Sequence, residues 1–314
     1  MAGGSARARF LARYGSIAGL VLLMAVMALS SSAFLTLGNL SNLARQVSIN
    51  AIIAAGMTFV IITGGIDLSV GSLVALSGCV GMLVIDRAGG DAAGILAGIA
   101  VGGVAGAVNG ALVAWARIPP FLVTLAGLTA YRGLALISTG GTPIIRFEGD
   151  FRFIGQGFLW GVPVPVVIMA AVMLAAHVVL TRTAFGAHVF AVGGNEEASR
   201  LSGVGVAATK LWAYVITGAL TGLAGMVLAA RLSSAQPNTG EGFELDAITA
   251  VVLGGTSLMG GRGTVWGTMV GALIIGVLNN GFNLLAVDAY YQLVAKGTII
   301  ILAVLLDQHL KKRM

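Results

Sequence analysis

The amino-acid sequence predicts an all-α integral membrane protein with about ten transmembrane helices and both termini in the cytoplasm. Of its 314 residues, 57% are hydrophobic and only 10% are charged, whereas about a quarter of the residues in soluble domains are charged. The mean hydropathy is +0.97, and the apolar residues form runs long enough for helices to cross a bilayer. We therefore expect residues 1–314 to form a single transmembrane domain.

Ten apolar segments can be placed along the chain. They cover residues 16–35, 47–63, 69–86, 93–115, 119–138, 163–181, 209–231, 246–260, 265–287 and 291–308. The first follows Arg7, Arg9 and Arg13 and could be mistaken for a signal peptide, but its apolar run is longer than such peptides have. We expect a retained helix after a cytoplasmic tail at residues 1–15.

The eighth segment is short and contains Gly254–Gly255, so a re-entrant segment is an alternative to a crossing helix. Charge favours a crossing. If all ten segments cross, eleven Lys and Arg residues lie inside and four lie in outer loops; otherwise the counts become seven and eight. The positive-inside rule favours the first arrangement. The eleven are Arg7, Arg9, Arg13, Arg117, Arg182, Arg200, Lys210, Arg262, Lys311, Lys312 and Arg313, the four are Arg45, Arg87, Arg146 and Arg152, and Arg132, Arg231 and Lys296 fall near the outer ends of segments.

This topology predicts a main periplasmic loop at 139–162 and a cytoplasmic loop at 182–208. It also suggests two inverted five-helix repeats. Asn109–Gly110 and Asn280–Gly281 occur in segments four and nine, which would cross in opposite directions. Inverted repeats are frequent in transporters, although a chain with 47 glycines could show this pattern by coincidence. So much Gly in a membrane chain indicates close helix–helix contacts.

Several kinds of chemistry are missing from the sequence. It has no Gly-Lys pair, so it cannot contain the P-loop that hydrolyses ATP. The single Cys79 and three scattered His residues predict no metal site. The net charge of +6 is explained by topology and not by nucleic-acid binding. The polar groups expected at mid-membrane are neutral, which suits an uncharged polyol or sugar better than an ion.

Residues 63–72 read Thr-Gly-Gly-Ile-Asp-Leu-Ser-Val-Gly-Ser and join segments two and three. Two glycines interrupt the helix, and Asp67 then stands where a helix N-cap belongs, with Ser69 beside it. Two interpretations remain open. The stretch is either an ordinary capped turn or a broken helix that lines or gates a path, which is tolerated where it is buried or faces a cavity.

Residues 193–203 predict a short capped helix in the inner loop. Asn195 can cap it, Glu196 and Glu197 suit its first turn, and Arg200 suits its last. Such a helix is either an ordinary surface helix or a rigid element on which a motor subunit pushes. Further along, residues 254–264 are rich in Gly but lack a Lys, so we expect a tight turn between two helices and not a phosphate loop.

These stretches resemble the permease family of ribose/galactoside-type carbohydrate ABC importers. Residues 63–72 match the family's most recognisable motif, residues 193–203 are similar to its cytoplasmic coupling loop, and residues 254–281 with Tyr290–Tyr291–Gln292 resemble its C-terminal signature. Pro119–Pro120–Phe121–Leu122–Val123–Thr124–Leu125 also fits. The resemblance covers about residues 40–308.

The resemblance implies an inner-membrane permease subunit, not itself an enzyme, that imports a monosaccharide or polyol such as ribose, xylose or galactose by alternating access. Its partners would be a second permease copy, as a homodimer or heterodimer, a cytoplasmic ATPase, a periplasmic or lipid-anchored sugar-binding protein, and membrane lipid. ATP and Mg would be held by the ATPase, so we expect no cofactor on this chain. The implied coupling residues are Gly194, Asn195, Glu196, Glu197, Ala198, Arg200 and Gly203, and the candidate path or gate residues are Asp67, Ser69, Asn109 and Asn280.

Two alternatives to sugar import remain. One is a permease of the sister family that imports branched-chain amino acids, which has a similar architecture. The other is a secondary carrier that acts alone. An intramembrane enzyme is disfavoured because the His-Glu-x-x-His and Gly-x-Ser-x-Gly catalytic motifs are missing.

Overall fold

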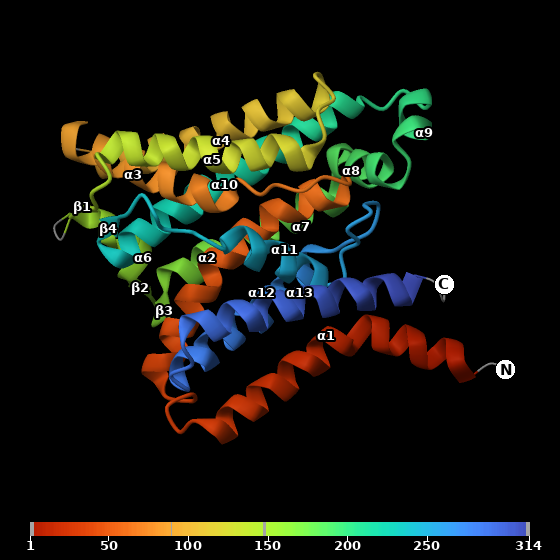
Figure 1. Ribbon diagram of the computed structural model, residues 1–314, viewed down its shortest axis with the longest axis horizontal. Helices are drawn as coiled ribbons and strands as arrows, with labels where there is room; N and C mark the ends of the chain where they lie inside the picture. The colour runs from red at the N-terminus through yellow and green to blue at the C-terminus, as the bar shows by residue number, and fades with distance from the viewer. Residues whose placement is uncertain (1–2, 89, 147–148, 312–314) are drawn as a thin grey trace.

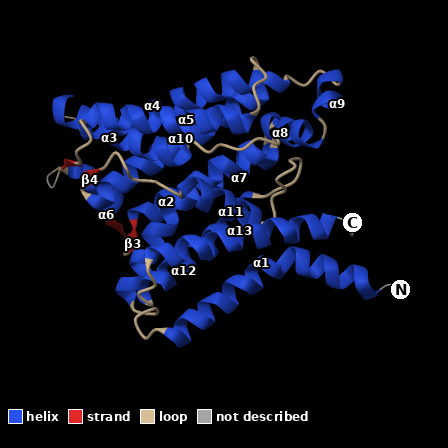
Figure 2. Cartoon of the chain, in the orientation of Figure 1, coloured by secondary structure: helices blue, strands red, loops and turns tan. Residues whose placement is uncertain are grey.

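A computed structural model describes residues 3–88, 90–146 and 149–311, and most of them are helical (Figure 2). The long helices are α1 (Gly3–Ser30), α2 (Leu37–Ile62), α3 (Val70–Ala88), α4 (Asp91–Ala114), α5 (Pro120–Thr139), α7 (Val164–Arg182), α10 (Val206–Leu232), α12 (Val265–Leu284) and α13 (Ala289–Lys311). The short elements are β1 (Ile144–Ile145), a 3-10 helix (Asp150–Arg152), α6 (Phe153–Gln156), β2 (Phe158–Leu159), β3 (Val162–Pro163), α8 (Ala184–Gly194), α9 (Glu196–Leu201), β4 (Ser234–Ala235) and α11 (Phe243–Leu253).

The long helices run between two ends of the molecule (Figure 1). One end carries the four short strands and α6, and we call it the strand end. The opposite end carries α8, α9 and both ends of the described chain, and we call it the α9 end. The four strands form two antiparallel pairs, β1 with β4 and β2 with β3.

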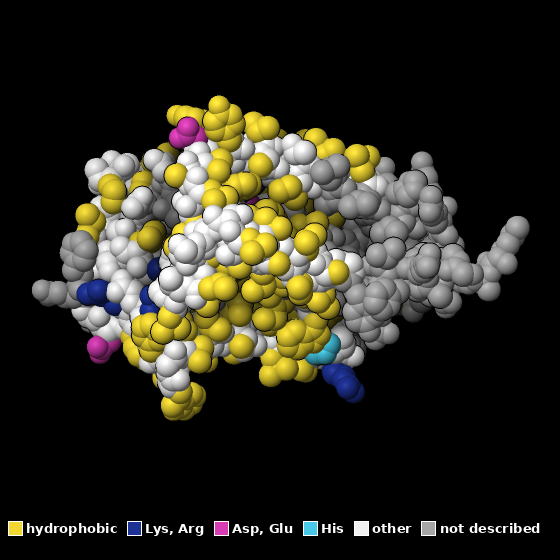
Figure 3. Space-filling model, turned by 90° about the horizontal axis from the view of Figure 1, so that it is seen from below, with side chains coloured by type: hydrophobic (Ala, Val, Ile, Leu, Met, Phe, Trp, Pro, Cys, Tyr) yellow, Lys and Arg dark blue, Asp and Glu magenta, His cyan; other side chains and the backbone are white. Residues whose placement is uncertain are grey.

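Seven helices of the described chain are long and apolar enough to cross a membrane: α2, α3, α4, α5, α7, α10 and α12. Hydrophobic side chains also dominate the middle of the face drawn in Figure 3, while the Lys, Arg and His side chains visible there lie toward its edges. This finding confirms the predicted class of an all-α membrane protein. Lys312 and Arg313, which entered the charge count, lie outside the described residues.

Every predicted segment contains a helix, but several helices begin earlier than predicted. α2 starts at Leu37, because the Thr36 hydroxyl caps it by accepting a hydrogen bond from the Asn39 N–H at 3.4 Å. α1 already starts at Gly3, so the stretch expected to be a tail is helical from that residue. Polar residues near these helix starts masked the helical pattern in the sequence.

The eighth segment forms the short helix α11, which ends at Leu253. Its 11 residues extend only about 16 Å at ~1.5 Å per residue, roughly half of the hydrocarbon core. Gly255 adopts a φ of 86° after it and stops the helix. The chain nevertheless passes from one end to the other here, since β4 pairs with β1 at the strand end and the Gly261 N–H bonds the Ile62 carbonyl beside α8.

Tight glycine packing holds the centre together. α2 is buried from Val47 to Ile62 and contacts α7, α10, α11 and α12. α4 carries glycines at every fourth position against α10, and a Cβ added at Gly102 would overlap the Gly218 carbonyl oxygen. Such small-residue faces let membrane helices approach closely. The expectation that the abundant Gly serves helix contacts is therefore confirmed for this pair.

One residue, Gln156, ties the elements of the strand end together. The Gln156 amide, at the end of α6, donates hydrogen bonds of 3.0 Å to the Ala230 and Arg231 carbonyls of α10. The Gln156 backbone carbonyl accepts a bond of 2.9 Å from Arg45 of α2, whose guanidinium also lies 4.7 Å from the centre of the Phe158 ring. The strand end is thus anchored on two central helices at once.

Candidate functional site

The turn between α2 and α3 is organised around one buried carboxylate. Asp67 is 2% exposed, and its Oδ1 accepts hydrogen bonds from the Ser69 N–H at 2.9 Å and the Ser69 hydroxyl at 2.6 Å. An Asp side chain that bonds the N–H two residues on closes a local turn. The Ser69 carbonyl then receives the Leu73 N–H and begins α3. Asp67 therefore orders the residue before the helix, as a cap would.

Three of the predicted path residues meet at this turn. The Asn109 amide of α4 donates to the Ser69 hydroxyl at 2.9 Å, and the Asn109 Oδ1 accepts from the Tyr131 hydroxyl of α5 at 2.9 Å. The chain Asp67–Ser69–Asn109–Tyr131 links α3, α4 and α5 through buried polar groups. Such a network is rigid while it is complete, and the loss of one member leaves the others unsatisfied.

The fourth predicted path residue, Asn280, does not join this network. It forms a reciprocal amide pair with Asn39 at the start of α2, with distances of 3.0 and 2.8 Å. The pair connects α12 to the first turn of α2.

A second buried cluster, which sequence reasoning did not bring together, has a similar layout. Asp246 in the first turn of α11 is 4% exposed and accepts a hydrogen bond of 3.1 Å from the Asn279 amide of α12. Lys296 of α13 forms an ion pair of 3.1 Å with the same carboxylate. In both places an amide bonds a polar residue near the start of the preceding helix: Asn109 bonds Ser69, and Asn279 bonds Asp246. The available signal was that Asp246 and Lys296 carry opposite charges near the outer ends of segments eight and ten.

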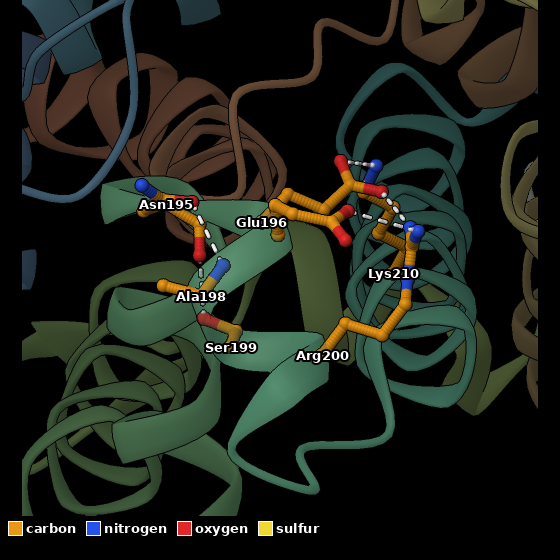
Figure 4. Close-up of polar contacts among 7 residues, drawn as sticks. Asn195, Glu196, Ala198, Ser199, Arg200 and Lys210 are labelled. Carbon is orange, nitrogen blue, oxygen red and sulfur yellow. Dashed lines mark hydrogen bonds and ion pairs between the residues drawn. The ribbon is translucent and has the colours of Figure 1, made fainter.

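The predicted capped helix is α9 (Figure 4), which lies at the end that also carries the chain termini (Figure 1). The Asn195 Oδ1 accepts a hydrogen bond of 2.9 Å from the Ala198 N–H. Arg200 pairs with both Glu196 and Glu197 at 3.1 Å. Pairs this exposed add little stability, so their main effect is to order the exposed face. The helix ends before Gly203, whose φ is 83°.

A further ion pair connects α9 to the long helix that follows it. The Glu196 carboxylate lies 2.6 Å from the Lys210 Nζ in the first turns of α10 (Figure 4). Leu201, at the end of α9, is 81% exposed. The helix α9 thus presents charged and apolar side chains on the surface, and its ion pair with Lys210 fixes it to α10.

The second and third motif stretches meet at Ile62, the last residue of α2, which directly precedes the first motif. The Gly261 N–H, from the turn between α11 and α12, donates a hydrogen bond of 2.9 Å to the Ile62 carbonyl at the end of α2. Gly193, at the end of α8, packs against both, and a Cβ there would overlap the Ile62 oxygen. We call Ile62, Gly193 and Gly261 the backbone junction. The expected tight turn at 254–264 is confirmed, and only small residues fit where it touches α8.

Buried polar networks and a capped surface helix on a bundle of membrane-spanning helices are typical of membrane transporters. Comparison with protein families then shows the group to which this protein belongs. Residues 39–304 match the family described as "Branched-chain amino acid transport system / permease component", and the chain belongs to this family.

Individual relatives are similar over nearly the whole chain. The ribose import permease protein of Bacillus subtilis (strain 168) is 48% identical over 94% of this chain and 92% of its own length. The ribose import permease protein of Haemophilus influenzae (strain ATCC 51907 / DSM 11121 / KW20 / Rd) is 44% identical over 96% and 95%. The D-allose transport system permease protein of Escherichia coli (strain K12) is 39% identical over 97% and 94%. No solved structure matches the chain.

Proposed function

We propose that this chain is the membrane-spanning permease subunit of an ATP-driven importer for ribose or a closely related monosaccharide in a bacterial inner membrane. The observation that carries the proposal is the 48% identity to a ribose import permease over 94% of the chain. A relative named for allose supports the same solute class, since allose is also a monosaccharide.

In this proposal the chain crosses the membrane ten times, with the α9 end in the cytoplasm and the strand end in the periplasm. The passage from β4 at the strand end to Gly261 at the α9 end supports a crossing at α11. The two five-helix repeats would begin at α1 and α7. The similar layout of the Ser69–Asn109 and Asp246–Asn279 contacts supports this inverted symmetry.

A separate ATPase would bind at α9 and supply the energy, because this chain has no P-loop. ATP binding would press the ATPase against α9, and the contact between Gly193, Gly261 and Ile62 would pass the movement to α2 and to the turn before α12. Asp67 and Ser69 lie directly after α2, so a shift of its end would act on the buried Asp67–Ser69–Asn109–Tyr131 network. The proposed result is alternating access.

A second permease copy and a sugar-binding protein would complete the importer. The binding protein would dock at the strand end and release its sugar there. Large apolar side chains, including Val104, Val108 and Leu125, are exposed on α4 and α5. In a membrane protein such faces are covered by lipid or by another subunit.

Import of branched-chain amino acids is the second candidate, because the description of the matched family names it. The relatives cited above are named for ribose and allose instead, and they favour sugar. A secondary carrier would need no ATPase.

The test is uptake by proteoliposomes that contain this chain, its ATPase and its binding protein. We expect labelled D-ribose to accumulate only when ATP is present on the side of the membrane that carries the ATPase. We expect labelled leucine not to accumulate. Uptake of leucine would favour the amino-acid importer, and ribose uptake without the ATPase would favour a secondary carrier. Either result would contradict the proposal.

A further inference from the structure

A polar cavity of about 200 Å³ lies between α2, α10, α11, α12 and α13. It is lined near the strand end by Arg231, in the last turn of α10, and by Gln292 near the start of α13, and it reaches Asn50 near the middle of α2. A single water needs roughly 10–15 Å³, and pockets for drug-sized ligands measure about 300–1,000 Å³. The volume therefore suits a small solute such as a monosaccharide.

The lining is rich in hydrogen-bonding groups and balanced in charge. Of the twelve lining residues, nine are polar or charged, and the charged ones are two cations and two anions. Five are carboxamides: Gln46, Asn50, Asn279, Asn283 and Gln292. A carboxamide both donates and accepts hydrogen bonds, as a hydroxyl does. The Asp246–Lys296 pair already neutralises itself, so the cavity offers partners to hydroxyl groups more readily than to an ion.

Asn50 is the member of this lining that most clearly lacks a protein partner. It is 5% exposed, yet within the described chain its amide makes no hydrogen bond, and it lines the cavity. Buried amides in folded proteins almost always have partners. Gln46 lies four residues earlier on the same face of α2 and likewise has no side-chain partner among the described residues. Both amides are available to something that enters the cavity.

We infer that this cavity is a subsite for an uncharged, polyhydroxylated solute on its way through the permease. Asn50 and Gln46 bind hydroxyl groups of the solute, and the Asp246–Lys296–Asn279 cluster forms the polar wall opposite. Phe243 and Ile49 supply apolar surface for the C–H groups of a sugar ring. The inference rests on the proposed function and adds the place where the permease itself contacts its cargo.

The first test replaces Asn50 by Leu, which keeps the volume and removes the amide. In proteoliposomes with the ATPase and the binding protein, we expect ribose uptake per ATP hydrolysed to fall about three- to tenfold, the range for a lost hydrogen bond. Stimulation of ATP hydrolysis by the loaded binding protein should stay at the wild-type level, because Asn50→Leu breaks no contact inside the chain. Thr129→Val removes a polar group from the exposed face of α5 and serves as the control. Uptake per ATP at the wild-type value in Asn50→Leu would overturn the inference.

The second test uses thiol labelling, for which the chain is well suited because its single Cys79 is 0% exposed. A small water-soluble thiol reagent should label Asn50→Cys, and D-ribose should slow the reaction. Thr58→Cys, at a fully buried position two turns further along α2, should stay unlabelled. Failure to label Asn50→Cys would show that no water-filled cavity reaches it and would overturn the inference.

The proposed import function and the inferred solute subsite would be contradicted by different results. If the wild-type chain does not import ribose with ATP, the proposed function fails. The rate of thiol labelling of Asn50→Cys can then be measured again in the presence of xylose, allose or leucine. A solute that occupies the cavity should slow this labelling. Protection by leucine but by none of the sugars would overturn the subsite for polyhydroxylated solutes.

Discussion

Gly193 and Gly194 are adjacent at the end of α8, yet their surroundings differ sharply. A Cβ at Gly193 would overlap the Ile62 carbonyl oxygen and lie 2.6 Å from the Gly261 nitrogen, whereas ordinary contact starts at 3.4 Å. A Cβ at Gly194 would meet nothing within 4 Å. Neither glycine has a positive φ, so Ala fits the backbone at both positions. The pair isolates the effect of crowding the backbone junction.

We expect Gly193→Ala to destabilise the protein by about 1–3 kcal/mol, the usual result of adding a methyl group to a filled site. The Ile62 oxygen and the Gly261 nitrogen are backbone atoms, which cannot rotate away as a side chain would. The α8 end must therefore move by several tenths of an ångström and stretch the 2.9 Å bond between Gly261 and Ile62. Gly194→Ala should leave stability unchanged or slightly higher, since Ala favours helix.

The assay is thermal unfolding in detergent, followed by ATP-driven uptake in proteoliposomes. The apparent melting temperature of Gly193→Ala should fall by roughly 2–10 °C, and its uptake per ATP hydrolysed should fall more than its ATPase rate. If both variants melt and transport alike, the contact at Gly193 does not link α8 to α2, and the proposed transmission through it is wrong.

Three further predictions concern separate features. Ser69→Ala removes a hydroxyl with two buried partners and should cost about 1–3 kcal/mol; an unchanged melting temperature would contradict the network. Gly102→Ala should disrupt the packing of α4 on α10 and lower the yield of folded protein on size-exclusion chromatography, while Gly103→Ala, whose nearest neighbour would lie at 3.8 Å, should not. Reversing charge with Glu196→Lys and Glu197→Lys should reduce recruitment of the ATPase to membranes, measured by sedimentation, and full recruitment would argue against a docking role for α9.

Apolar runs located the nine long helices and the short α11, because burial in lipid or in the bundle requires that pattern. They could not locate the ends of helices, since those are decided by individual bonds. α2 begins ten residues before its apolar run because Thr36 caps it and Arg45 finds a partner on Gln156. α11 is shorter than its apolar run because Gly255 takes a left-handed conformation after it.

Contacts of the candidate site between residues close in the sequence could be predicted, and contacts between distant residues could not. The Asn195 cap and the bonds between Asp67 and Ser69 lie within a few residues and could be anticipated from propensity alone. The contact between Asn109 and Ser69 spans 40 positions, and the ion pair between Asp246 and Lys296 spans 50. Such contacts depend on which helices become neighbours, and that information is absent from residue spacing.

The double attachment of Gln156 has a consequence for how a docking protein would act on this molecule. Its amide holds α10 while its backbone carbonyl holds Arg45 of α2. A protein that presses on the strand end would therefore act on both helices, since both are bonded to the same residue. The same α2 ends at Ile62, where it meets Gly193 and Gly261. The helix α2 thus connects the strand end with the backbone junction. A displacement at one end of α2 would be transmitted along the helix to the other end.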